Sequence, residues 1–81
     1  MSTESNYRAA FLKTFGIDES ALGANPGYQS FEEWDSVGHM ALMTELEDTF
    51  EIEMDIDDII DFTDFETGKD ILAKYGVLFD S

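Results

Sequence analysis

The strongest constraint on this chain is a helical pattern that begins at Asp35 and continues to Phe50. Asp35 is a favoured residue for the N-terminal cap of a helix. The segment contains no proline and, after Gly38, no glycine, so nothing in it interrupts a helix. Four large apolar residues recur along it at helical spacing and share one side: Leu42, Met43, Leu46 and Phe50. The pattern predicts a helix over residues 35–50 with that side buried.

Helical spacing also appears on both sides of this segment. Apolar residues recur three and four positions apart over residues 7–15, and Gly16 follows as a left-handed stop. Thr63 and Glu66 have the spacing of a capping box, which would open a last helix closed by Gly76. The side chains expected to share a face are Tyr7, Ala10, Phe11, Thr14 and Phe15 in the first helix, and Phe65, Ile71, Leu72 and Tyr75 in the last.

These patterns predict an all-α fold. We expect a small four-helix bundle of three long helices and one short helix near residues 57–61, with a long loop at residues 17–34 between the first and second helices. Loops of this length are uncommon without anchors, so Leu22, Tyr28 and Phe31 are expected to pin this one to the core. Trp34 is expected to pack in the core. The 81 residues suit a single domain, 1–81.

The charge of the chain restricts its partners. It contains 19 Asp and Glu against 4 Lys and Arg, for a net charge of −15. Between Thr14 and Gly68 there are sixteen acidic residues and no basic one. Such a surface repels nucleic acid and anionic membranes and attracts proteins with basic patches. The sequence therefore predicts protein partners and no nucleic acid.

The absence of cysteine removes several kinds of chemistry. There is no Cys in the sequence, and hence no disulfide, thiolate metal site or cysteine nucleophile. No apolar run has the length of a membrane span, and residues 1–6 lack the features of a secretion signal. We expect a cytoplasmic monomer that is not inserted in a membrane.

The helix over residues 35–50 has a second apolar side. Small and apolar residues at positions 37, 40, 41 and 44 project nearly opposite to the buried side, with acidic residues beside them. Apolar anchors within a charged rim are typical of a docking surface. The alternative is that Val37 and Met40 cover the loop at residues 17–34. The predicted partner-docking residues are Val37, Met40, Thr44, Glu47, Asp48 and Glu51.

Ser36 would lie in the first turn of this helix. Backbone N–H groups have no helical partner there and the helix dipole is positive. An anion attached to the serine hydroxyl would be favoured at that place, although Asp35 would oppose it by charge repulsion. An Asp-Ser pair at a helix start is an ordinary cap in most proteins, so the residues around it decide its meaning.

Those residues resemble a known motif. The segment Asp35-Ser36-Val37, with the helix that follows it, is similar to the modification motif and recognition helix of acyl carrier proteins. The resemblance extends to the length, the order of the helices, the charge and the position of the serine. That family commonly has Leu after the serine, where this chain has Val37. Gly38-His39 resembles the Gly-His of many stand-alone carriers outside housekeeping fatty acid synthesis. The later residues that match are Leu42, Leu46, Glu47 and Phe50.

The resemblance implies a carrier and not an enzyme, with no catalytic residues and no metal site of its own. A phosphopantetheinyl transferase, using coenzyme A and Mg²⁺, would attach a 4′-phosphopantetheine arm to Ser36 through a phosphodiester. Asp35 would position the serine or the metal during this transfer. The thiol of the arm would hold acyl or aminoacyl groups as thioesters, in fatty acid or polyketide biosynthesis. Enzymes that load, transfer or condense these groups would dock on the acidic helix through basic patches.

Other interpretations of the same residues remain. An acidic helical inhibitor, similar to an immunity protein that masks a basic enzyme, would explain the charge but give Ser36 no function. A Ser36–His39 hydrolase would need an orienting acid and an oxyanion hole, and a histidine packed over Leu42 and Met43 is simpler. A calcium loop starting at Asp55 is disfavoured, because isoleucines stand at its fifth and sixth positions.

Overall fold

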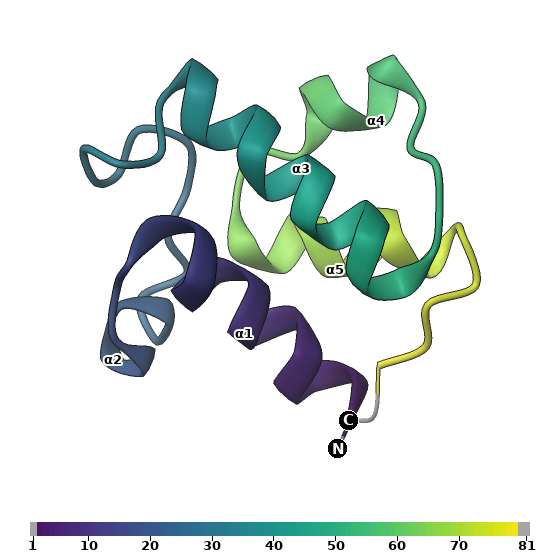
Figure 1. Cartoon of the computed structure of the whole chain (residues 1–81), viewed down its shortest axis with the longest axis horizontal. Helices are drawn as coiled ribbons and strands as arrows, with labels where there is room; N and C mark the ends of the chain where they lie inside the picture. Colours follow the sequence, from purple (N-terminus) through teal and green to yellow (C-terminus); the bar gives the residue numbers. More distant parts are fainter. Residues whose placement is uncertain (1, 80–81) are drawn as a thin grey trace.

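The computed structural model describes residues 2–79, which form an all-α fold, as predicted. Within this range there is no strand, and Gly27 and Asp64 form an isolated antiparallel bridge. Residues 2–79 contain five helices, where the sequence pattern predicted four. They are α1 (Thr3–Phe15), α2 (Glu19–Leu22), α3 (Ser36–Phe50), α4 (Ile56–Asp61) and α5 (Phe65–Ala73) (Figure 1).

The two predicted helix ends with the clearest local signals are confirmed. α1 ends at Gly16, whose φ of 65° is left-handed and whose N–H donates to the carbonyl of Leu12 at 2.9 Å. α3 begins after Asp35, whose Oδ1 accepts a hydrogen bond from the N–H of Gly38 at 2.8 Å. Both contacts satisfy backbone groups that a helix end leaves without partners.

Two predictions about helix ends differ from the structure. The predicted capping box at Thr63 is wrong: Asp64 is the cap of α5, and its Oδ1 accepts from the N–H of Thr67 at 2.7 Å. Asp is as good a cap as Thr, so the helix starts one residue later. The last helix was also predicted to be closed by Gly76. Instead α5 ends at Ala73, and a turn connects it to Gly76, which has a φ of 88°.

The fifth helix lies in the segment predicted to be a loop. α2 is a single turn that follows Asp18 and buries Leu22. It lies at one end of the molecule, beside the end of α1 (Figure 1). A helix of four residues is too short to produce a periodic apolar pattern, which is why it was not predicted. Tyr28, expected to anchor the same segment in the core, is instead 39% exposed, whereas Phe31 is half-buried against the core.

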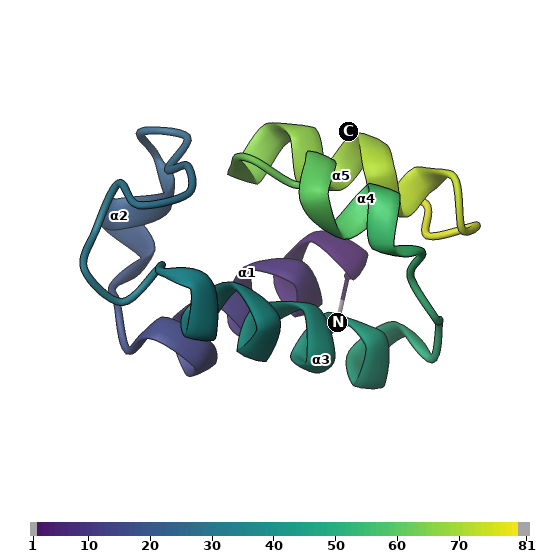
Figure 2. The same cartoon turned by 90° about the horizontal axis from the view of Figure 1, so that it is seen from above.

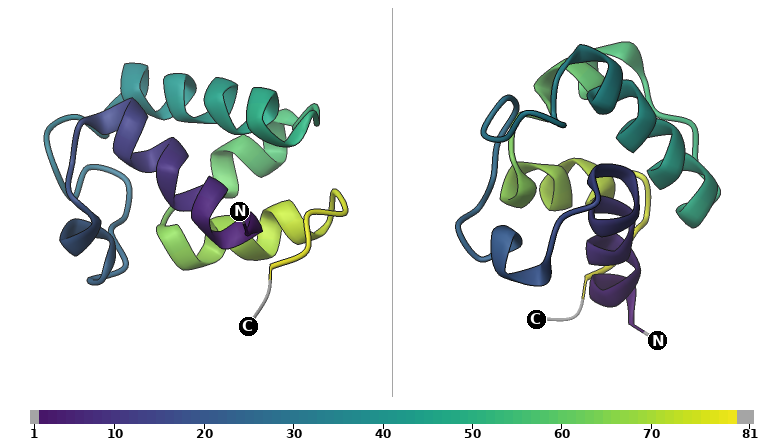
Figure 3. Two further views of the ribbon diagram at one scale, coloured as in Figure 1. Left: turned by 60° about the horizontal axis from the view of Figure 1, so that its bottom comes forward. Right: turned by 60° about the vertical axis from the view of Figure 1, so that its left-hand side comes forward.

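The helices enclose a core rich in aromatic side chains. α1 packs against α3, and α4 and α5 lie together on one side of α3 (Figures 2 and 3). The ring of Phe11 lies 5.0 Å from those of Tyr7 and Phe65 and 5.5 Å from that of Trp34, between centroids. Edge-on contacts of this kind add to the stability that burial itself provides. The predicted core position of Trp34 is confirmed.

The buried face of α3 is largely the predicted one. Leu42, Met43 and Leu46 are buried, whereas Phe50 is half-buried at the edge of the core. The opposite face of α3 is therefore left for solvent. Among residues 2–79, no helix combines the length and the apolarity that a bilayer span requires.

Candidate functional site

Ser36 is the first residue of α3, and its side chain is exposed. The place where α3 starts is fixed by the Asp35 cap and by Gly38. A Cβ atom at position 38 would overlap the carbonyl oxygen of Glu33, so only glycine lets the preceding chain cross the helix this closely. Gly38 was noted in the sequence only for its family resemblance. Its structural effect is to let the backbone at Glu33 lie against the first turn of α3, where Ser36 is located.

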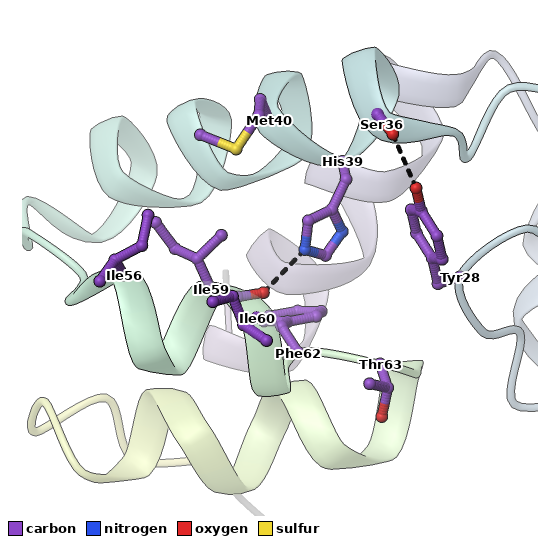
Figure 4. Close-up of a pocket in the computed structure, with 9 residues that line it drawn as sticks. All are labelled: Tyr28, Ser36, His39, Met40, Ile56, Ile59, Ile60, Phe62 and Thr63. Atoms are coloured by element: carbon purple, nitrogen blue, oxygen red, sulfur yellow. Dashed lines mark hydrogen bonds between the residues drawn. The ribbon is translucent and has the colours of Figure 1, made fainter.

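An apolar cavity of about 410 Å³ lies beside Ser36, between α3 and α4 (Figure 4). This volume is within the range of small-molecule sites. Ser36 and Tyr28 stand at one end of the cavity, and Ile56 lies towards the other. The residues that line it are Tyr28, Ser36, His39, Met40, Ile56, Ile59, Ile60, Phe62 and Thr63. The site therefore places the Ser36 hydroxyl beside a mainly hydrocarbon wall.

The isoleucines of α4 were not predicted to belong to the site. Ile56 and Ile60 are 67% and 66% exposed, which is unusual for such large apolar side chains. Together with Ile59 they have helical spacing and line one wall of the cavity. The helical spacing of these isoleucines is visible in the sequence, but the sequence does not show that they face α3.

His39 connects the wall of the cavity to the core. Its Nδ1 lies 2.9 Å from the indole Nε1 of Trp34, and its Nε2 lies 2.8 Å from the carbonyl oxygen of Ile59. An indole N–H can only donate, so Nδ1 accepts, and Nε2 carries the proton and donates to Ile59. Because both nitrogens are engaged, neither serves as a base for Ser36, as the hydrolase interpretation would require.

The predicted docking residues lie mainly on the surface. Val37 is 79% and Met40 48% exposed, and Thr44, Asp48 and Glu51 are exposed as well. Val37 therefore does not cover the loop at residues 17–34, as the alternative proposed, and Met40 lines the cavity instead.

Glu47 differs from the other predicted docking residues. It is half-buried, and its Oε2 accepts a hydrogen bond from the N–H of Met54 at 2.9 Å. This bond holds the segment after α3 against the helix. Glu47 thus has a structural function, whatever its contribution to docking.

Two of the predicted docking carboxylates, those of Asp48 and Glu51, are not neutralised by an ion pair among residues 2–79. All four basic side chains form ion pairs within the chain, but no ion pair among residues 2–79 involves Asp48 or Glu51.

In α4, Asp58 accepts hydrogen bonds from Lys74 and Tyr75. The described part of the chain contains no group of three side chains arranged to hold a metal ion.

Comparisons with family models, with curated proteins and with solved structures find no match to this chain. The assignment of a function therefore depends on the chemistry of Ser36 and its surroundings.

Proposed function

We propose that this chain is a carrier of the acyl carrier type, which bears a 4′-phosphopantetheine arm on Ser36. The observation that carries the proposal is an exposed serine hydroxyl at the start of a long helix, on the rim of an apolar cavity. We also propose that α1, α3, α4 and α5 form the four-helix arrangement of that family, with residues 17–34 as the long connection between α1 and α3. The proposal further includes a single domain that works as a cytoplasmic monomer.

The residues at the start of α3 suit a phosphodiester. The first N–H groups of the helix favour an anion next to Ser36. In the attachment reaction Ser36 loses its hydroxyl proton and forms an Oγ–P bond. The pyrophosphate bond of coenzyme A breaks, and adenosine 3′,5′-bisphosphate is released with the proton. Asp35 uses Oδ1 for the cap, and its other oxygen would help to position the Mg²⁺ that the transferase requires for this step only.

The bound arm would supply a thiol, which a chain without cysteine cannot provide. The apolar walls formed by Met40 and the α4 isoleucines would shelter an acyl or aminoacyl cargo from water. Val37, Met40 and Thr44, with the carboxylates of Glu47, Asp48 and Glu51, would form the surface on which enzymes with basic patches dock. Those enzymes would load, transfer or condense the cargo in fatty acid or polyketide biosynthesis.

The test is a direct measurement of mass. The unmodified protein is incubated with coenzyme A, Mg²⁺ and a phosphopantetheinyl transferase of broad specificity, and weighed by mass spectrometry. The wild type is expected to gain one arm and Ser36→Ala none. Ser20→Ala, which removes an exposed serine hydroxyl from α2, is the matched control and should still gain the arm.

The alternative is an acidic inhibitor that masks a basic enzyme, and it predicts a different result. The wild type would then gain no mass while its circular dichroism remained helical. That outcome would contradict the carrier function, and the cavity beside Ser36 would need another explanation.

A further inference from the structure

We propose that Tyr28 is a positioning residue for Ser36, and that it holds the phosphate of the arm once the arm is attached. This inference rests on the proposed function. The phenol oxygen of Tyr28 lies 2.9 Å from Oγ of Ser36, within hydrogen-bond distance (Figure 4). Tyr28 reaches Ser36 from the segment between α2 and α3, so the contact is not a by-product of the helix itself.

The backbone around Tyr28 is attached to the linker between α4 and α5. The N–H of Tyr28 donates to the carbonyl of Thr63 at 2.8 Å, and the N–H of Phe65 donates to the carbonyl of Pro26 at 2.9 Å. Between them, Gly27 pairs with Asp64. A Cβ atom at Gly27 would lie 2.9 Å from the carbonyl oxygen of Thr63, closer than side chains are normally found. The segment around Tyr28 therefore packs closely against the linker between α4 and α5.

The ring of Tyr28 is held as well as its backbone. It meets the ring of His39 edge-on, with 5.5 Å between centroids and an angle of 80°. His39 is itself fixed through both ring nitrogens. Although Tyr28 is 39% exposed, the position of its hydroxyl is fixed by the hydrogen bonds of its backbone and by the contact of its ring with His39. This placement distinguishes it from a surface tyrosine that meets a serine by chance.

The chemistry of the two hydroxyls suggests what this contact does. A free serine side chain populates several rotamers, and a hydrogen bond to a fixed phenol selects one of them. After attachment, Oγ is an ester oxygen without a proton, so Tyr28 can only donate, and the charged acceptors bonded to the same phosphorus are the two non-bridging phosphate oxygens. A hydrogen bond from a neutral donor to a charged oxygen is stronger than one between neutral groups. The contact therefore orients the nucleophile first and stabilises the product afterwards.

The kinetic test compares Tyr28→Phe with the wild type in the attachment reaction. If Tyr28 orients Ser36, kcat falls about fivefold, the effect of one hydrogen bond, and KM for the carrier stays unchanged. Tyr75→Phe is the matched control, because it also removes a phenol hydroxyl, in this case one that has two hydrogen-bond partners and lies outside the cavity. It should leave both constants unchanged. An unchanged or raised kcat in Tyr28→Phe, or an effect on KM alone, would overturn the inference.

A second readout does not depend on the rate. The ³¹P resonance of the attached phosphodiester is expected to move in Tyr28→Phe and not in Tyr75→Phe, relative to the modified wild type. An identical resonance in all three proteins would overturn the second half of the inference and leave the carrier function intact. If the wild type gains no arm at all, the proposed function fails and the inference fails with it.

Discussion

The indole N–H of Trp34 donates a hydrogen bond to Nδ1 of His39 over 2.9 Å, and the two rings stack at an angle of 16°. Trp34 is fully buried, whereas His39 lies at the wall of the cavity and donates through Nε2 to Ile59 of α4. These bonds join the core to α4 along the wall of the cavity. His39 therefore helps to hold α4 in place beside the cavity.

We therefore predict that His39→Ala destabilises the protein by about 1–3 kcal/mol, because it leaves the buried indole N–H without an acceptor. Urea denaturation followed by circular dichroism measures this. Thr44→Ala, at an exposed position of the same helix, is the control and should change stability by less than about 0.5 kcal/mol. In the wild type, ¹⁵N NMR should find the neutral ring protonated at Nε2. A ring protonated at Nδ1 instead would be incompatible with the hydrogen bonds of His39 to Trp34 and Ile59.

The rotation of α3 gives a second prediction. Leu46 is fully buried and Val37 is 79% exposed on the other side of the helix. Leu46→Ala should lower the free energy of unfolding by about 2–5 kcal/mol, and Val37→Ala by less than about 0.5 kcal/mol. Phe50→Ala should fall between them, since Phe50 is half-buried. Equal losses for Leu46→Ala and Val37→Ala in urea denaturation would mean that α3 buries a different face.

Local signals in the sequence predicted most of the fold. Gly16 and Asp35 mark helix ends through their own backbone and side-chain chemistry, and both predictions are confirmed. The signals failed where they were ambiguous or too short. Thr63 and Asp64 are neighbouring cap residues, and the sequence does not show which one the helix uses. The single turn of α2 is too brief for any periodicity.

Only the part of the site that lies on α3 could be predicted from the sequence. The exposure of Ser36, Val37 and Met40 follows from the periodicity of one helix. Tyr28 and Ile60 belong to segments that reach the cavity beside Ser36 only through tertiary packing. No pattern within residues 17–34 indicates that Leu22 becomes buried while Tyr28 turns towards α3. The cavity is likewise a product of how α4 lies against α3, which the spacing of its isoleucines does not specify.

The contact between α4 and the end of α5 gives a prediction about pH. Asp58 accepts hydrogen bonds from Nζ of Lys74, at 2.5 Å, and from the hydroxyl of Tyr75. The hydrogen bond from Lys74, and after it the one from Tyr75, holds the pKa of Asp58 below its ordinary value. The folded protein therefore binds this proton less tightly than the unfolded chain. The stability that results is present above the ordinary carboxyl pKa of about 3.9 and is lost as the pH falls through the lowered value.

The same bond acts on the lysine with the opposite sign. The hydrogen bond to Asp58 raises the pKa of Lys74 above its ordinary value. Its contribution is complete below the ordinary lysine pKa of about 10.4 and is lost as the pH rises through the raised value. The pair should therefore be coupled most strongly between about pH 4 and pH 10.

A double-mutant cycle isolates this coupling from the repulsion among the other acids, which also changes with pH. The cycle uses Asp58→Asn, Lys74→Gln and the combined variant, with unfolding free energies measured near neutral pH and again well below the carboxyl range. We expect a favourable coupling at neutral pH that disappears in acid, because a protonated Asp58 has no charge to attract Lys74. Tyr75→Phe should weaken the neutral-pH stability without removing the coupling. A coupling that persists unchanged in acid would show that α4 is held to α5 by packing and not by this ion pair.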